Sequence, residues 1–269
     1  MGYVHCAERK LAKRGETVTV ELRLGDCMEI IKEVPDCCID LIVTDPPYKF
    51  ENQGGGFYAR NESTRRQYLD SLKQIKCCEF EPRLFLESVQ AKMKKFYGYF
   101  FCNKSLVDEY IRFAKERNYQ YDILVMAKHN PIPAYNNHHL SDLEYIVMMR
   151  ERGTYFSKHK CMDDYRKFYL TRCKKGIHPA EKPIELVQRF IRVSSQQGDT
   201  ILDCFMGSGT TGVACVKEGR NFIGIEINES YYRIAESRIA NEKRDKEVNM
   251  VFDFTDHPEN SSETNNDKI

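Results

Sequence analysis

The amino-acid sequence predicts an α/β fold, with helices covering both faces of a doubly wound, mostly parallel sheet. Segments with a strand pattern alternate with amphipathic helical segments along most of the 269 residues, and this alternation favours a parallel sheet. Two turns suited to ligand binding, one rich in proline and one rich in glycine, directly follow predicted strands. Open α/β sheets place their active sites at such turns. The length fits one large domain or two small ones.

The pattern of side chains supports each element of the first half. Residues 17–24 alternate apolar and polar side chains as a strand does, and Gly25 with Asp26 ends that strand. Pro82 suits the first turn of a helix, because a backbone N–H would have no helical partner there. We therefore expect strands at 17–24, 39–44 and 96–102, and helices at 27–34, 82–94 and 104–117.

The second half continues the alternation. Asn228 is a suitable N-cap for the last helix, because its short side chain can accept a hydrogen bond from the first turn. Residues 49–74 lack periodicity, and we expect a mobile loop over the site there. The polar residues 246–269 are expected to form a disordered tail. The predicted strands are 122–127, 144–149, 200–204 and 221–225, and the predicted helices are 183–194, 210–218 and 228–241.

The composition favours a cytoplasmic enzyme over a membrane or secreted protein. The apolar runs are too short to span a membrane, and the first residues lack a signal-peptide pattern. The eleven cysteines include no C-x-x-C spacing, which indicates reduced thiols and neither disulfides nor a zinc site. His129, His138 and His139 have no acid or Cys partner at ligand spacing. Polar loop histidines are therefore favoured, and no metal is expected.

Charge is balanced over the whole chain but not along it. The net charge is +1, whereas residues 150–182 contain ten Lys or Arg and only four Asp or Glu. Aromatic residues are interleaved in the same segment. Basic and aromatic residues together are typical of a nucleic-acid interface. A charged, solvated excursion from the core would look the same, so the sequence leaves both interpretations open. The aromatic residues are Tyr155, Phe156, Tyr165, Phe168 and Tyr169.

Asp45-Pro46-Pro47-Tyr48 is the most informative motif, because it follows the buried predicted strand 39–44. The two prolines stiffen the turn and remove two backbone donors, while its carbonyls and the Asp45 carboxylate can accept hydrogen bonds. Tyr48 offers a flat face for stacking. Such a turn suits a planar ligand with an exocyclic amino group, for example a nucleobase turned out of its stack. The alternative is an ordinary proline-rich turn with a capping Asp.

A glycine-rich turn follows the predicted strand 200–204. Gly207, Gly209 and Gly212 satisfy G-x-G-x-x-G, which lets a ligand approach the backbone at a helix N-terminus. Glu226 ends the next strand, nineteen residues after Gly207, and an acid there can bind ribose hydroxyls. The pattern fits a dinucleotide or S-adenosylmethionine, and a purely structural turn is the alternative. A P-loop is excluded because no Lys follows, and no set of residues for hydride transfer supports a dehydrogenase.

Together, and in this order, the motifs resemble those of the DNA amino-methyltransferases that use S-adenosylmethionine. The Asp-Pro-Pro-Tyr block precedes the Asp-x-Phe-x-Gly-x-Gly block at 203–209, and a basic variable segment separates them. This circularly permuted order is similar to that of the β group. Two shorter elements also match, and the resemblance covers roughly residues 18–241. They are Leu24-Gly25-Asp26-Cys27 and His178-Pro179-Ala180-Glu181-Lys182-Pro183.

The resemblance implies two sets of site residues. The catalytic set is Asp45, Pro46, Pro47 and Tyr48. The cofactor-binding set is Asp26, Cys27, Asp45, Lys182, Asp203, Phe205, Gly207, Ser208, Gly209 and Glu226. Residues 203–209 would hold the methionine part of S-adenosylmethionine and Glu226 its ribose hydroxyls. Asp26 and Cys27 would lie near its adenine, and Lys182 would approach its carboxylate, with a Lys-Pro helix start as the alternative explanation of Lys182.

The chemistry implied by the resemblance needs no covalent intermediate, so no nucleophilic Cys is expected. Hydrogen bonds from the target amino group to Asp45 and to the Pro46 carbonyl would turn the nitrogen lone pair toward the methyl group, while Tyr48 stacks on the extruded base. Asp in the first position is, by resemblance, commoner in N6-adenine enzymes, and Ser in N4-cytosine enzymes. We therefore expect N6-adenine methylation of double-stranded DNA, with N4-cytosine methylation as the alternative.

The resemblance also predicts how the chain is organised. It implies a Rossmann-like methyltransferase domain at 1–245 with one antiparallel strand, and an inserted target-recognition region at about 128–176. Because this region is short, we expect a short target sequence or the help of a second subunit in a homodimer. A bacterial or phage-like restriction-modification enzyme fits this description. The sequence also leaves open methylation of RNA or of a protein amide, and a DNA-binding protein of this fold without catalysis.

Overall fold

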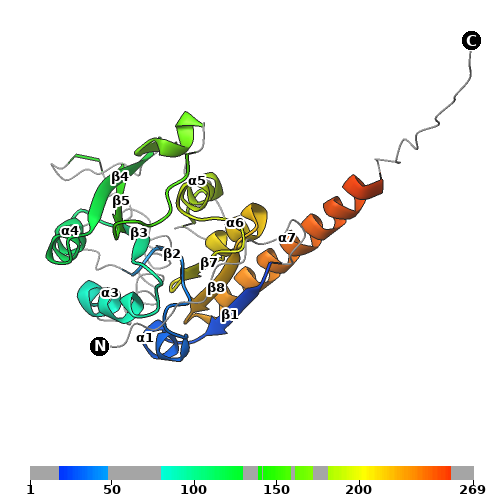
Figure 1. Cartoon of the computed structure of the whole chain (residues 1–269), viewed down its shortest axis with the longest axis horizontal. Coiled ribbons are helices and arrows are strands. Elements are labelled where there is room, and N and C mark those ends of the chain that lie inside the picture. Colours follow the sequence, from blue (N-terminus) through cyan, green and yellow to red (C-terminus); the bar gives the residue numbers. More distant parts are fainter. Residues whose placement is uncertain are drawn as a thin grey trace, which may run out of the picture.

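The protein folds around one eight-stranded sheet with the strand order β1-β8-β7-β2-β3-β5-β4-β6 (Figure 1). The computed structural model describes residues 18–47, 80–129, 139–140, 142–158, 161–171 and 181–255. The strands are β1 (Val20–Leu24), β2 (Leu41–Thr44), β3 (Tyr97–Cys102), β4 (Gln120–Lys128), β5 (Leu143–Arg150), β6 (Phe168–Thr171), β7 (Thr200–Asp203) and β8 (Asn221–Glu226).

The sheet is parallel except at β5, which pairs antiparallel with both of its neighbours, β3 and β4. The predicted mostly parallel sheet with one antiparallel strand is thereby confirmed among the described residues. The chain order reverses between β7 and β2, which are adjacent and parallel. Ligands of open α/β sheets bind at such a switch point, beyond the carboxyl ends of the strands.

Helices cover both faces of the sheet, with α1, α3 and α4 on one side and α5, α6 and α7 on the other (Figure 1). Their bounds are α1 (Cys27–Ile30), α3 (Pro82–Gln90), α4 (Val107–Glu116), α5 (Ile184–Ser194), α6 (Thr210–Glu218) and α7 (Glu229–Thr255), with short 3-10 turns η1 (Ile31–Glu33) and η3 (Met162–Tyr165). Among the described residues, no helix has the length and apolar character needed to cross a membrane.

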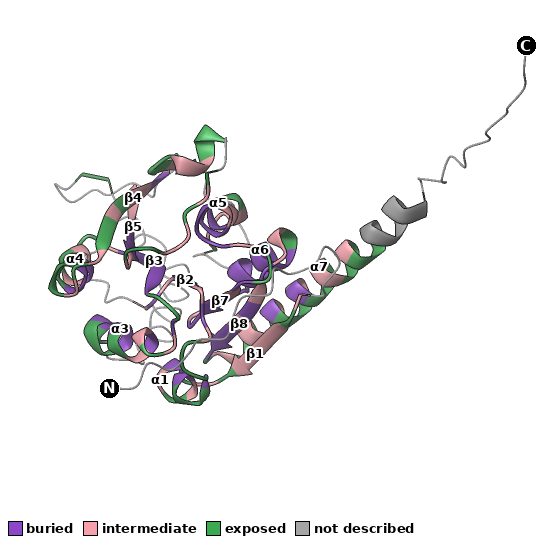
Figure 2. Cartoon of the chain, viewed as in Figure 1, coloured by how far each residue is buried: buried purple, intermediate pink, exposed green. Residues whose placement is uncertain are grey.

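The core lies where the central strands meet these helices. Every residue of β2 and β3 is buried, as expected for strands covered on both faces. The ring of Phe190 on α5 stacks on Tyr99 with centroids 4.2 Å apart, and Phe100 on the opposite face packs between Phe85 and Tyr110. Figure 2 shows this buried centre and the more exposed strand β4 beside it. The central strands are therefore firmly held, which fixes the turns that follow them.

Within the predicted target-recognition region at 128–176, β5 corresponds to the strand predicted at 144–149; it lies between β3 and β4 in the sheet and buries Ile146 and Val147. The role of the region in target recognition stays a prediction. The strand β6 and the turn η3 were not predicted, since each is only four residues long and lies within the charged segment 150–182. Strand β6 pairs parallel with β4 and forms one edge of the sheet.

The end of the chain also differs from the prediction. Helix α7 continues from the expected end at Asn241 to Thr255, and so enters the segment 246–269 that was predicted to be disordered. Lys246 explains part of this extension, because its ammonium donates a hydrogen bond to the Val216 carbonyl at the end of α6 over 2.5 Å. The predicted loop at 49–74 and residues 256–269 lie outside the described residues.

Candidate active site

Asp45 directly follows β2, at the carboxyl edge of the sheet where the proline-rich turn was predicted to place it. Pro46 is buried and Pro47 is partly buried, so the turn is packed against the core. The Asp45 carboxylate forms an ion pair with Lys182, with 2.7 Å between Oδ2 and Nζ. Tyr48, the fourth residue of the motif, lies outside the described residues.

The ion pair belongs to a larger group of charges at this edge. Lys182, whose side chain is only 9% exposed, also contacts Glu144 at 3.1 Å, and Glu144 in turn pairs with Lys128. The Lys182 ammonium lies 5.1 Å from the centre of the Phe101 ring. We call Asp45, Lys182, Glu144 and Lys128 the charge ladder. Glu144 and Lys128 carry no motif signal, and sequence reasoning missed both.

The two oxygens of Asp45 have different surroundings. Oδ2 is bound by Lys182, whereas Oδ1 is shielded from solvent and has no hydrogen-bond donor among the residues that the structure describes. Burial raises the pKa of Asp45, and the Lys182 ammonium opposes this rise. A buried acceptor without a donor is costly, so Oδ1 is suited to receive a donor from a ligand.

The second acid of the site, Asp203, ends β7 next to Asp45. Its Oδ1 accepts hydrogen bonds from the Thr44 hydroxyl at 2.7 Å and from the Phe205 backbone N–H at 3.1 Å. Thr211 supplies a further side-chain hydrogen bond. Burial nevertheless raises the pKa of Asp203 to about 6. Thr44 thus ties β2 to β7 at the switch point, a contact that the sequence did not indicate.

The glycine-rich turn joins β7 to α6, as predicted, and its glycines serve different purposes. A Cβ atom added at Gly207 would meet nothing within 4 Å. One added at Gly209 would lie 2.8 Å from the Ala235 Cβ on α7. Both residues have a positive φ, 51° and 82° respectively, which side chains disfavour. The space above Gly207 can therefore take a ligand, whereas Gly209 lets two helices pack.

Glu226 at the end of β8 folds back over this turn. One of its oxygens accepts the Gly207 N–H and the other accepts the Asn228 N–H, each over 2.8 Å. The Gly25 N–H donates to the Glu226 carbonyl over 2.9 Å, which brings the start of α1 to the same place. There the Asp26 side chain caps α1 by accepting the Met28 N–H, and Cys27 is buried. The structure therefore brings Asp26, Cys27 and Glu226 together.

Ser208 and Phe205 lie in the glycine-rich turn as predicted, but their side chains contact other residues of the protein. The Ser208 hydroxyl and carbonyl both accept hydrogen bonds from Arg238 on α7 over 2.8 Å. Arg238 also pairs with Glu181 at 2.5 Å, and so links the turn to the segment that carries Lys182. The Phe205 ring packs against Phe85, with centroids 5.3 Å apart. Sequence reasoning missed Arg238, because an Arg on a surface helix carries no signal of its own.

These groups fit the cofactor that the sequence resemblance implies. Open space above Gly207 leaves room beside backbone N–H groups at a helix N-terminus, which favour a carboxylate. Buried acids on β7 and β8 suit the positive charges and hydroxyls of S-adenosylmethionine. Lys182 contacts Asp45 and Glu144 in this structure, so its predicted approach to the cofactor carboxylate stays a prediction. Among the described residues, no cluster of His, Cys, Asp and Glu could hold a metal ion.

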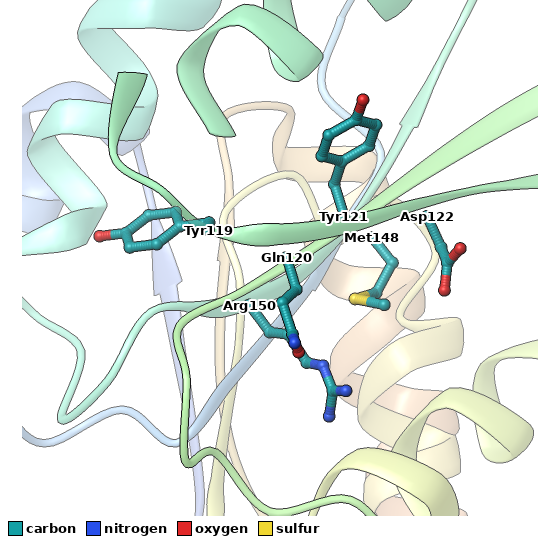
Figure 3. Close-up of a pocket in the computed structure, with 6 residues that line it drawn as sticks. All are labelled: Tyr119, Gln120, Tyr121, Asp122, Met148 and Arg150. Carbon is teal, nitrogen blue, oxygen red and sulfur yellow. The ribbon is translucent and has the colours of Figure 1, made fainter. Parts of the chain in front are cut away.

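A hollow of about 380 Å³ at the other end of β4 and β5 is separate from this site. Figure 3 shows Gln120, Met148 and Arg150 pointing into it. Gln120 pairs with Arg150 at the amino end of β4, whereas Lys128 and the charge ladder lie at the carboxyl end. The acids and glycines described above all lie at the carboxyl edge, and the hollow is not part of the candidate active site.

Comparison with known proteins agrees with this geometry. A family model described as DNA methylase matches residues 39–237. The chain belongs to this family. The match includes both the Asp45 turn and the glycine-rich turn, so the resemblance to DNA amino-methyltransferases that use S-adenosylmethionine is confirmed.

Relatives of this DNA methylase are found among characterised bacterial enzymes. The type II methyltransferase M.HinfI of Haemophilus influenzae is 28% identical over 244 residues, which cover 80% of this chain and 67% of that protein. The DNA adenine methyltransferase YhdJ of Escherichia coli is 28% identical over 262 residues, covering 80% of this chain and 81% of that protein. M.BglI of Bacillus subtilis is 45% identical over 80 residues, but these span only 23% of it.

Solved structures show the same fold. The complex of M1.HpyAVI with S-adenosylmethionine matches with a TM-score of 0.64 and 25% identity, covering 82% of this chain and 100% of that one. The PvuII methyltransferase, described as cytosine-N4-specific, matches with a TM-score of 0.59 and 16% identity, covering 85% of this chain and 92% of that one. A protein described as cytosine-N4-specific therefore shares this fold, and the fold alone does not name the target base of this chain.

Proposed function

We propose that this DNA methylase transfers the methyl group of S-adenosylmethionine to the exocyclic N6 of an adenine turned out of double-stranded DNA. The observation that carries the proposal is the Asp45 carboxylate at the end of β2. Lys182 holds one of its oxygens, and the other is buried without a donor among the described residues. An amino group of a flipped base is the donor that such a position suits.

The residues of the chain contribute mainly by placing hydrogen-bond acceptors. Asp45 Oδ1 accepts one N–H of the target amino group, and the Pro46 carbonyl accepts the other. Both hydrogen bonds draw the nitrogen toward tetrahedral geometry, so that its lone pair becomes available for attack. Bound S-adenosylmethionine would supply an activated methyl group on a sulfonium: the C–S bond breaks as the N–C bond forms, the thioether S-adenosylhomocysteine leaves, and the nitrogen releases one proton to solvent. Alignment and electrostatic fit account for the rate, and Tyr48 stacks on the base.

The cofactor is held at the switch point between β7 and β2. Gly207 and Gly209 shape the turn that receives its methionine part, with Asp203 and Phe205 below them and Ser208 fixed by Arg238. Glu226 binds the ribose hydroxyls, because backbone N–H groups of Gly207 and Asn228 hold its carboxylate in place and a carboxylate has about four acceptor sites. Asp26 and Cys27 border the adenine.

Adenine is proposed over cytosine on two grounds. The motif begins with Asp, which by family resemblance is commoner in N6-adenine enzymes. The relative YhdJ, described as a DNA adenine methyltransferase, matches over 80% of this chain. Cytosine N4 is the second candidate, because the PvuII enzyme shares the fold. The parts of residues 128–176 outside β5 are proposed to recognise the target sequence.

The substrate class is tested by methyl transfer from labelled S-adenosylmethionine to DNA, RNA and protein in parallel. We expect label in DNA alone. Label in RNA or protein and none in DNA would overturn the proposal. The Asp45→Ala variant is expected to bind the cofactor and to transfer no methyl group above background. Wild-type turnover in that variant would show that Asp45 has no catalytic role.

A further inference from the structure

Glu144 reaches the site because β5 runs against the rest of the sheet. The parallel strands β2, β3 and β7 end at the carboxyl edge, whereas the antiparallel strand β5 begins there. Glu144 is the second residue of β5 and pairs with Met126, two residues before Lys128 on β4. Glu144 and Lys128 therefore lie beside the turn that carries Asp45, although neither belongs to a motif.

The contacts of Glu144 point toward the reacting group. It touches Lys182 at 3.1 Å, and Lys182 touches Asp45 at 2.7 Å, so a single ammonium connects the two acids. The side chain of Lys182 is only 9% exposed and that of Glu144 only 19% exposed. Although burial acts to raise it, the pKa of Glu144 is lowered, because Lys182 and Lys128 favour the carboxylate. Glu144 thus stays charged and holds Lys182 between two anions.

We propose that Glu144 is a positioning residue of the methyl-transfer site: it holds the Lys182 ammonium beside Asp45, so that Lys182 occupies one Asp45 oxygen and the other remains turned to the target amino group. The proposal rests on the function proposed above, and it extends that function by a residue that neither motif contains. Lys128 supports Glu144 from the outer end of the charge ladder. Glu144 acts through Lys182 and does not itself touch the base.

The charge ladder also sets the ionisation of Asp45. A negative charge at Glu144 disfavours the Asp45 carboxylate, whereas the positive charges of Lys182 and Lys128 favour it. Changing the two outer members of the ladder should therefore move the titration of Asp45 in opposite directions. The charged or titratable groups that face Asp45 are Lys182 before α5, Glu144 on β5, Lys128 on β4, Cys102 on β3 and Asp203 on β7.

The test uses the full chain with the variants Glu144→Gln, Glu144→Asp and Lys128→Met. Glu218→Gln is the matched control, because Glu218 is 15% exposed and pairs with Arg192 at 2.8 Å at the carboxyl end of α6. The first readout needs neither cofactor nor DNA: the carboxyl resonance of Asp45 is followed by carbon-13 NMR as the pH is changed. We expect a lower Asp45 pKa in Glu144→Gln, because the like charge is lost and Lys182 then pairs with Asp45 alone, a higher one in Lys128→Met, and no shift in Glu218→Gln.

The second readout is the rate of a single turnover on DNA. Glu144→Gln should lower this rate by about tenfold to a hundredfold with little change in the KM for DNA, as expected when a functional group loses its support. Glu144→Asp keeps the charge but withdraws it by one methylene. In Glu144→Asp, the Asp45 pKa should therefore stay at its wild-type value while the single-turnover rate falls.

The outcomes separate this proposal from the proposed function. The proposal would be overturned if the Asp45 pKa stayed at its wild-type value in both Glu144→Gln and Lys128→Met while thermal stability fell as in Glu218→Gln. The charge ladder would then only stabilise the fold. Shifts in the same direction would also overturn the proposal. Absence of methyl transfer to DNA by the wild-type protein would instead refute the proposed function, and the NMR titration would still decide the role of Glu144.

Discussion

Replacing Gly207 and Gly209 by alanine, one at a time, should separate cofactor binding from folding. Both glycines have a positive φ, and an alanine there costs about 1–2 kcal/mol. At Gly207 nothing lies within 4 Å of the new methyl group. At Gly209 the methyl group would lie 2.8 Å and 2.9 Å from the Cβ and Cα of Ala235, and the helix backbone cannot easily move away. Such overpacking adds about 1–3 kcal/mol.

The two variants should therefore differ clearly in thermal unfolding and in cofactor binding. With about 2–4 °C per kcal/mol for a chain of this size, Gly207→Ala should lower the melting temperature by about 2–8 °C and Gly209→Ala by about 4–20 °C, with Gly209→Ala always the lower of the two. Calorimetry with S-adenosylmethionine should show at least about tenfold weaker binding by Gly207→Ala, because its methyl group fills the space above the turn. Equal melting temperatures, or wild-type affinity in Gly207→Ala, would refute the reasoning.

Three further predictions follow from buried contacts. Burial raises the pKa of Asp203 to about 6, so its stabilising effect is complete below about pH 4 and is lost as the pH rises through about 6. Urea unfolding of wild type and Asp203→Asn should show a stability difference that changes by about 3 kcal/mol between about pH 3 and about pH 7, and a difference that does not change with pH would contradict this prediction. Arg238→Met should lower the unfolding free energy by about 1–3 kcal/mol, because Ser208 and Glu181 both lose a charged partner. An unchanged urea midpoint would show that these contacts of Arg238 do not stabilise the protein. Ending the chain after Arg238 removes the buried Ile239 and should cost about 3 kcal/mol or more, and an unchanged melting temperature would contradict this prediction.

Most of the fold could be predicted because its central elements have clear periodic patterns. The buried run of β2 and the amphipathic faces of α4 and α5 gave the right elements, with ends shifted by a few residues. Two elements failed for physical reasons. Strand β6 has only four residues and lies at an edge of the sheet within a charged segment, so its short apolar run gives little signal. The extension of α7 depends on Lys246 reaching a carbonyl of α6, a contact between distant residues that no local pattern shows.

The residues of the candidate site also include some that the sequence predicts and some that it does not. Asp45, Gly207 and Glu226 could be placed from the sequence, because each lies in a turn that follows a strand. Glu144 and Arg238 could not, since they reach the site only through the reversed direction of β5 and the packing of α7 on the turn. The sequence also suggested that Lys182 approaches the cofactor, whereas the structure shows its ion pairs with two acids.

The most direct test of the central claim is the identity of the methylated nucleoside. Unmethylated genomic DNA would be incubated with labelled S-adenosylmethionine and either wild type or Asp45→Ala, then digested and analysed by mass spectrometry. The account predicts label in N6-methyladenine with wild type and none with Asp45→Ala. Label in N4-methylcytosine would contradict the adenine assignment and leave the role of Asp45 intact. No label in DNA from a wild-type protein that binds the cofactor would contradict the account as a whole.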